Sequence, residues 1–212
     1  MSANLGGSVV ERVLFAASRL FYADGVRAVG IDRIVADSGV SKTSLYRHFQ
    51  TKEQLVAAFL EREDREFWRQ WDGVVAAAPN PQAELMSLLV WIGERVSRDW
   101  YRGCPHINVA SEFSDPEHPA RKIRRRHKVA MLERLRNIVG RIGVTWPDDI
   151  SDQLALLIDG AFMSDGRLSK TKAVRILQNG ADALLGGMEF EEGASRAAGY
   201  GRSQKRLSGR KP

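Results

Sequence analysis

The sequence has a single cysteine in 212 residues, so no disulfide bond can form within one chain. Absence of disulfides is typical of proteins from a reducing compartment, and it predicts a cytoplasmic location. No apolar run reaches the roughly 18 to 20 residues that a membrane-spanning helix needs. The first residues also lack the basic-then-apolar layout of a signal peptide. We therefore expect neither a secreted nor a membrane protein.

Catalytic and metal-binding motifs are also missing. The four histidines are scattered, and no H-x-x-x-H or C-x-x-C spacing occurs. There is neither a glycine-rich phosphate loop nor a G-x-S-x-G motif. The segment Cys104-Pro105-His106 leaves open a reactive thiol beside a base or part of a metal site, although a lone cysteine on an apolar helix is usually buried and inert. The sequence predicts no catalytic residue, no metal ligand and no cofactor.

Acidic residues are scarce at both ends of the chain. The net charge is +6, and six of the 32 basic residues lie in residues 195–212, where no acidic residue occurs. Residues 1–52 hold seven basic and four acidic side chains. Basic ends on an otherwise neutral chain favour a polyanionic partner. The basic tail is expected to be disordered, and it either adds non-specific phosphate contacts or is inert.

Strand-like alternation is nearly absent, whereas helical periodicity runs through the chain. Ser8 and Glu11 have the S-x-x-E spacing of a capping box, Asp24-Gly25 marks a helix stop, and Thr51 and Gln54 resemble a second capping box. We expect an all-α fold of about nine helices. Its predicted parts are a three-helix head (1–52), a larger helical body (53–187) and a flexible basic tail (188–212). After the first helix, the others are expected over 31–38, 42–49, 51–78, 82–100, 105–113, 120–142, 150–166 and 170–185.

The segment IDRIVADSGVSKTSLYRHFQTKEQL, residues 31–55, has the layout of a helix-turn-helix. Gly39 lies where the turn needs a positive φ, Val40 is expected to enter the core between the helices, and Ser41 can cap the second helix. Ala36 is expected to let the two helices approach closely. The alternative is a small helical corner with an ordinary solvated face.

The second helix of this segment would present its polar side to a DNA major groove. Hydroxyls and an amine at its start suit phosphates and base acceptors, and Tyr46 can stack and hydrogen-bond. Lys52 begins the next helix, where the positive end of the helix dipole favours a phosphate. The predicted DNA-contacting residues are Lys42, Thr43, Ser44, Tyr46, Arg47, His48 and Lys52.

The stretch GVRAVGIDRIVADSGVSKTSLYRHFQTKEQL resembles the tetracycline-repressor (TetR) family of bacterial regulators, most closely along SLYRHF and TKEQL. The resemblance implies an all-α homodimer that binds a near-palindromic double-stranded operator, usually as a repressor released by a small molecule. It implies groove and backbone contacts for Lys42 to Ser44, Tyr46 and His48 and a phosphate contact for Lys52, and Arg47 is added because it lies in the same helix. Val35 and Ser38 stand where the family often has alanine, and Gly30 where it often has a threonine or serine cap, so one phosphate contact is expected to be lost.

The last two helices carry apolar stripes that predict a dimer interface. Two adjacent apolar helices can pair with their copies across a two-fold axis as a four-helix bundle. The alternative is that both stripes face only the core of their own subunit. The predicted interface residues are Leu154, Leu157, Ile158, Ala161, Val174, Leu177, Ala181 and Leu184.

The middle helices contain apolar, aromatic and isolated polar residues that predict a pocket for a small-molecule effector. Plain core packing is the alternative for each apolar residue, and a structural cap or ion pair is the alternative for Asp159. The predicted pocket residues are Trp91, Cys104, His106, Ile107, Asn108, Phe113, Met131, Asp159 and Phe162.

These features favour a ligand-responsive, dimeric DNA-binding repressor. A DNA-binding architectural or constitutive regulator without a ligand is the second hypothesis. The third is a small helical enzyme or thiol sensor built around Cys104, and no catalytic constellation in the sequence supports it.

Overall fold

The computed structural model describes residues 7–164 and 166–186, and within these ranges the chain forms nine α-helices and no strand. The all-α prediction is confirmed, whereas the predicted tail lies outside the described residues. None of the described helices is both long and apolar enough to span a bilayer. The helices are α1 (Val9–Asp24), α2 (Ile31–Ser38), α3 (Lys42–His48), α4 (Lys52–Ala76), α5 (Pro81–Val96), α6 (Pro105–Ser111), α7 (Pro119–Ile142), α8 (Pro147–Phe162) and α9 (Lys170–Gly186).

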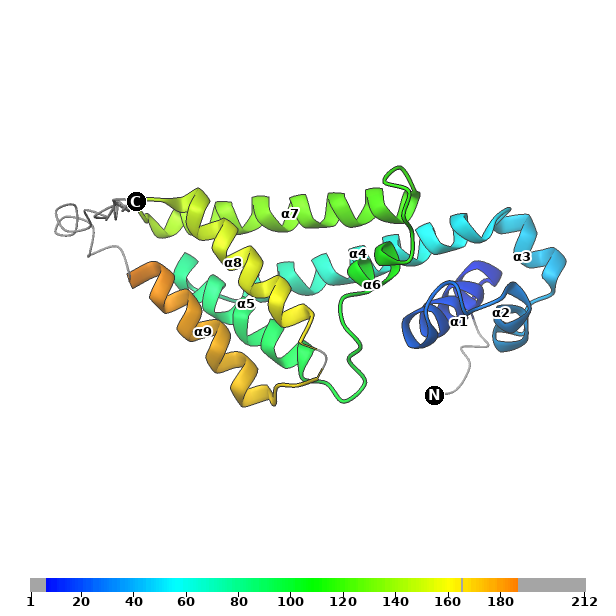
Figure 1. The fold of residues 1–212 in the computed structure, drawn as a ribbon, viewed down its shortest axis with the longest axis horizontal. Coiled ribbons are helices and arrows are strands. Elements are labelled where there is room, and N and C mark those ends of the chain that lie inside the picture. The colour runs from blue at the N-terminus through cyan, green and yellow to red at the C-terminus, as the bar shows by residue number, and fades with distance from the viewer. Residues whose placement is uncertain (1–6, 165, 187–212) are drawn as a thin grey trace, which may run out of the picture.

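The molecule is elongated, with a small head of α1–α3 at one end and a larger helical body at the other (Figure 1). The long helix α4 leaves the head and runs into the body, where α5 and α7 pack against it. Helix α9 lies along α5, and α8 packs against both α7 and α9. The helix-turn-helix segment is therefore held at the tip of the molecule, away from α8 and α9.

Two apolar cores correspond to the head and the body, but the head core continues past the predicted boundary at residue 52. It includes Leu55 and Phe59 from α4, Val109 from α6 and Ile123 from α7. The head is consequently packed against three elements of the body. The boundary itself stays a prediction, since hydrophobic contacts run across it.

The sequence signals for helix ends are confirmed with one exception. Ser8 and Glu11 form both bonds of the capping box, with Ser8 N–H donating to Glu11 Oε2 at 2.8 Å and Glu11 N–H donating to Ser8 Oγ at 3.3 Å. At the start of α4, Thr51 Oγ1 accepts from the backbone N–H of Gln54, but the Gln54 side chain accepts from Gln50 N–H. The second capping box therefore lacks its return bond to Thr51.

The predicted dimer stripes turn out to be wrong for five of their eight residues. Helix α9 packs so closely on α5 that a Cβ on Gly93 would lie 2.6 Å from a methyl group of Val174. Packing of this kind covers the apolar side of α9 within its own subunit. Three of the predicted interface residues, Leu157, Val174 and Leu184, remain partly exposed. A residue that is buried in the core of its own subunit cannot contact a second copy. The five predicted interface residues buried in this way are Leu154, Ile158, Ala161, Leu177 and Ala181.

Candidate nucleic-acid interface and effector site

The turn between α2 and α3 has the geometry that the sequence predicts. Gly39 adopts φ +61° and ψ +25°, the left-handed conformation that glycine tolerates best. Ser41 Oγ accepts a 3.1 Å hydrogen bond from Ser44 N–H and caps α3. Val40 is buried, as predicted, but Ala36 is exposed on α2, so its expected role at the close approach of the helices is wrong.

An arginine on α1 holds this turn in place, which the sequence did not predict. The Arg12 guanidinium donates to the carbonyl oxygen of Ser38 at 2.8 and 3.2 Å and to that of Gly39 at 2.9 Å. These carbonyls end α2, where backbone acceptors lack helical partners. Because charge-assisted hydrogen bonds are the stronger kind, Arg12 ties the angle of α3 to α1.

Helix α3 is anchored by its apolar side and presents its polar side to solvent. Leu45 faces the head core together with Ile34 and Phe49, and all three are buried. Tyr46 lies on the solvent-facing side and is 41% exposed. Four other predicted DNA-contacting residues are exposed, namely Lys42, Thr43, Arg47 and His48.

The two remaining predicted contacts are partly buried. The Ser44 hydroxyl lies 2.9 Å from that of Ser41, within the cap of α3, so it is already engaged in a hydrogen bond. Lys52 opens α4, directly after the capping residue Thr51. Its position at a helix N-terminus beside the exposed face of α3 suits a phosphate. Seven predicted residues thus lie on one end of the head, and their contacts with DNA stay a prediction.

An acidic side chain interrupts this basic face. Asp32 on α2 accepts a 2.7 Å hydrogen bond from Lys42 Nζ, and its carboxylate side chain is 82% exposed. This contact raises the pKa of Lys42 above its ordinary value. Nothing in the sequence pattern identified Asp32, because the pair joins two helices across the turn.

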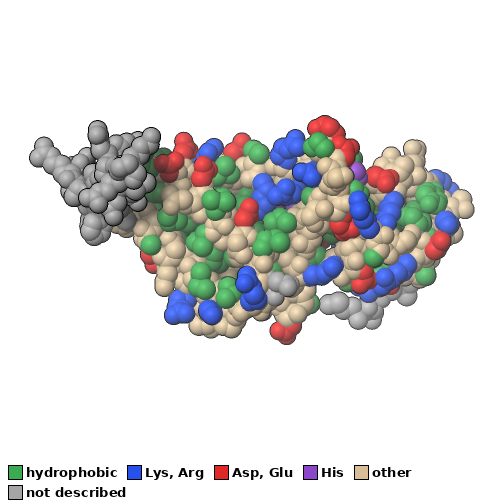
Figure 2. All heavy atoms as spheres, viewed as in Figure 1, with side chains coloured by type: hydrophobic (Ala, Val, Ile, Leu, Met, Phe, Trp, Pro, Cys, Tyr) green, Lys and Arg blue, Asp and Glu red, His purple; other side chains and the backbone are tan. Residues whose placement is uncertain are grey.

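Gly30 precedes α2 without any side-chain cap, as the missing hydroxyl in the sequence implies. Basic and acidic side chains are mixed across the visible face of the head in Figure 2. The surface of the head is therefore not uniformly basic, and its charge varies from residue to residue.

The body contains a hollow of about 260 Å³, part of which is open to solvent. Three predicted pocket residues, Cys104, His106 and Phe162, line it. Sequence reasoning missed its other wall residues, which are Glu63, Phe67, Arg95, Tyr101 and Pro105. Much of this volume is open to solvent, so the enclosed space is far smaller than the roughly 300–1,000 Å³ typical of drug-sized ligand sites.

The other predicted pocket residues lie outside the wall of this hollow. Met131 is buried in the body core, and Trp91 and Ile107 pack against that core. Asn108 donates to the Arg102 carbonyl oxygen at 2.8 Å, and Phe113 stacks on His118 with ring centroids 3.6 Å apart. Asp159 pairs with Lys128, which is the structural alternative considered for it.

The hollow adjoins a buried polar cluster that the sequence did not bring together. His106 on α6 stacks on His127 of α7, with ring centroids 4.1 Å apart and planes within 4°. His127 Nδ1 lies 2.7 Å from Asp64 Oδ1 on α4. Burial lowers the pKa of both histidines from 6.5 to about 3, so both imidazoles are neutral at pH 7. His127 falls in a run of basic residues, which gave no sign of its burial.

Hydrogen bonds connect this region to the head. Glu112, at the end of α6, accepts from the backbone N–H groups of Val26 and Arg27 at 2.8 and 2.7 Å. Tyr22 on α1 donates to the Gly103 carbonyl at 3.1 Å and accepts from Arg102 N–H at 2.8 Å. Both ends of the α6 region are therefore tied to the end of α1.

Comparison with known proteins agrees with these features. Residues 13–59 match the family model described as "Bacterial regulatory proteins, tetR family". The chain is 31% identical over 86 residues to the HTH-type transcriptional regulator Rv1255c of Mycobacterium tuberculosis, an alignment that covers 41% of this chain and 43% of that protein. The match thus spans less than half the length of that curated relative.

The likeness to solved structures extends over the body. The TetR-family transcriptional regulator SCO4454 from Streptomyces coelicolor superposes with a TM-score of 0.80 at 27% identity, over 84% of this chain and 95% of that one. Residues 13–59 thus carry a TetR-family region, and the chain shares the fold of a TetR-family regulator. A second TetR-family structure, CifR in complex with a 26-base-pair operator DNA, shares the fold with a TM-score of 0.69 at 18% identity, over 81% of this chain and 94% of that one.

Proposed function

We propose that the protein is a sequence-specific, DNA-binding transcriptional regulator that acts as a homodimer and responds to a ligand held in its body. The observation that carries the proposal is the polar, solvent-facing side of α3, which is fixed by its buried side and by the Arg12 contacts to the turn. A rigid helix with exposed hydroxyl, amine and aromatic groups suits both base edges and phosphates. The fold that the chain shares with operator-bound CifR supports this orientation.

Dimer formation needs an exposed apolar surface on each copy. Helices α8 and α9 retain one after their inner stripes are buried, because Leu156 is 73% exposed and Met163 and Ile176 are also exposed. Figure 2 shows hydrophobic side chains on the visible face over these helices. We infer that this outer face, rather than the predicted inner stripes, joins the two copies.

The ligand response is supported by the position of α6. This short helix lines the hollow at its start and binds the head through Glu112 at its end. A ligand that shifts α6 would change the contacts that orient the head relative to the body. Regulation without a ligand is the alternative function, and the small size of the hollow favours it over binding of a large organic effector.

Selection of binding sites from a random DNA library by the purified protein tests the proposal. Enrichment of a two-fold symmetric site is expected, with Tyr46→Ala lowering the affinity for that site at least about tenfold while the melting temperature is unchanged. Trp146→Ala is the matched control, since Trp146 is an exposed aromatic residue of the body. If no sequence were enriched, or if Tyr46→Ala bound like the parent, α3 would not be the recognition helix.

A further inference from the structure

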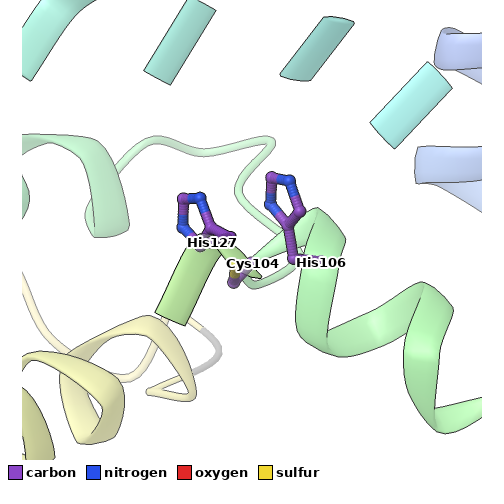
Figure 3. Close-up of side chains that lie close together, drawn as sticks. All are labelled: Cys104, His106 and His127. Carbon is purple, nitrogen blue, oxygen red and sulfur yellow. The ribbon is translucent and has the colours of Figure 1, made fainter. Parts of the chain in front are cut away.

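Three potential metal ligands lie together between α6 and α7. Cys104 precedes α6, His106 is in its first turn, and His127 lies in the middle of α7. One ligand atom from each residue lies within 4.8 Å of the others, and all three side chains are buried. Figure 3 shows the two imidazoles side by side with the Cys104 side chain next to them.

The two histidines have hydrogen-bonding capacity that the protein does not use. Across the part of the chain that the structure describes, the Nε2 atoms of His106 and His127 are buried and have no hydrogen-bond partner. His106 is 2% exposed and His127 is 1% exposed. A buried polar atom without a partner is unfavourable by roughly 1–3 kcal/mol, so two such atoms beside one thiol call for a ligand.

We propose that Cys104, His106 and His127 form a binding site for a zinc-like divalent transition-metal ion. Two imidazole nitrogens and one thiolate match the ligand set of tetrahedral zinc sites, which leave a fourth position for water or a carboxylate. In such a site the ligand atoms are about 3.3–3.6 Å apart, given metal–nitrogen and metal–sulfur distances of about 2.0 and 2.3 Å. In this structure the three ligand atoms lie within 4.8 Å of one another, and small side-chain rotations would bring them to the spacing of a metal site.

Asp64 completes the chemistry of the site. Its carboxylate accepts from His127 Nδ1, and this arrangement leaves the Nε2 lone pair of His127 for the metal. When the ion binds, the Cys104 thiol loses its proton to solvent, and the thiolate and Asp64 together offset two positive charges. Lys128, whose charge would repel the ion, is paired with Asp159.

The hollow gives access to the site, because Cys104 and His106 both line it. Its limited volume suits an ion better than a drug-sized molecule. Burial raises the pKa of Cys104, which argues against a role as an exposed, reactive thiolate in the absence of a metal. The position of two ligands at the start of α6 would make this ion the effector of the regulator, a role that rests on the proposed function.

Cobalt(II) titration of chelator-treated protein tests the site without DNA. Tetrahedral cobalt bound by a thiolate gives intense visible d–d bands and a near-ultraviolet charge-transfer band, which excess zinc should abolish. Cys104→Ser should remove the charge-transfer band, and His127→Gln should remove both. Asp64→Asn should weaken cobalt binding about 10- to 100-fold, as expected for a residue that orients a ligand.

His118→Asn is the matched control. His118 lies outside the cluster and caps α7 by accepting from Ala120 N–H, a role that asparagine also fills. This variant should bind cobalt like the parent. Absence of a thiolate–cobalt band in the parent protein, or an unchanged band in Cys104→Ser with native circular dichroism, would overturn the site.

A separate experiment tests whether the ion is the effector. It measures the affinity of the protein for the selected DNA site in the presence of zinc and in the presence of chelator. A change of at least about tenfold in the parent, absent in Cys104→Ser, supports it. An unchanged affinity alongside positive cobalt spectra overturns the effector role but not the site. Failure to select any DNA site would contradict the proposed function and leave the spectroscopic result unaffected.

Discussion

Asp32 places a negative charge on the surface that we propose faces DNA. Its carboxylate neutralises Lys42, one of the predicted phosphate or base contacts, and its own exposure would bring it close to the phosphate backbone. Binding of DNA must therefore break the Asp32–Lys42 pair or tolerate a repelling charge. We expect the acidic side chain at this position to lower the affinity for DNA.

We predict that Asp32→Asn increases the affinity for DNA by about two- to fivefold at near-physiological salt, a typical effect for one exposed charge pair. The salt dependence should become steeper because Lys42 is free to neutralise a phosphate. Fluorescence anisotropy at several salt concentrations measures both effects.

Glu117→Gln provides the control for this measurement, because it removes an exposed carboxylate that pairs with Lys122, outside the head. It should leave DNA binding unchanged. Weaker binding by Asp32→Asn would show that Asp32 positions Lys42 rather than repelling DNA.

At this scale the sequence identified residues with local signals and missed those that depend on contacts over long sequence distances. Ser41, Gly39 and Tyr46 could be placed because capping, turn and helix-face patterns are local. Arg12 is 26 residues from the Ser38 carbonyl that it binds, and His127 is 63 residues from Asp64. No periodicity encodes such pairs, so they were visible only in the fold.

Among the elements, the α2–α3 turn depends on one backbone conformation. Gly39 has φ +61°, and a Cβ at this position would lie 2.9 Å from the Arg12 guanidinium. A side chain here would both strain the backbone and push away the group that holds the turn. The turn is therefore doubly specific for glycine.

We predict that Gly39→Ala destabilises the protein by at least about 1–2 kcal/mol and lowers DNA affinity, because α3 loses its fixed angle. Gly140→Ala is the control, since Gly140 lies within α7 with open space around it and should gain about 0.5–1 kcal/mol. Urea denaturation compares the two. Equal stability of Gly39→Ala and the parent would mean that the turn adapts freely.

Glu112 links the end of α6 to the head through two hydrogen bonds. We predict that Glu112→Ala loses about 1–3 kcal/mol of stability, because two backbone N–H groups of the head lose a charged acceptor. The same change should reduce any effect of a ligand on DNA affinity. Denaturation and anisotropy measure the two consequences.

Glu133→Ala is the control for this change. Glu133 is an exposed glutamate on α7 and forms no ion pair with another residue of the described chain. It should change stability by less than about 0.5 kcal/mol. A loss of stability in Glu112→Ala with full ligand response would place the coupling elsewhere.

For the whole molecule, the all-α class and the order of the helices could be predicted because helical periodicity and caps recur along the chain. The packing of the helices in the body could not be predicted from the sequence. Apolar stripes on α8 and α9 looked alike whether they faced a partner or their own subunit, and only the contact between α5 and α9 decided between the two. The remaining exposed residues, including Leu156, define the surface that a second copy can use.

We predict that Leu156→Arg converts a dimer into a monomer, because it places a charge at the most exposed large apolar side chain of α8, in the surface that we propose joins the two copies. Affinity for a two-fold symmetric DNA site should fall about 10²- to 10⁴-fold, since the second half-site is no longer bound by a linked copy. Light scattering coupled to gel filtration and anisotropy measure the mass and the affinity. Val129→Arg alters another exposed apolar residue, on α7, and should leave the mass and the affinity unchanged. If Leu156→Arg remained dimeric while Val129→Arg dissociated, the two copies would meet through α7 instead of α8.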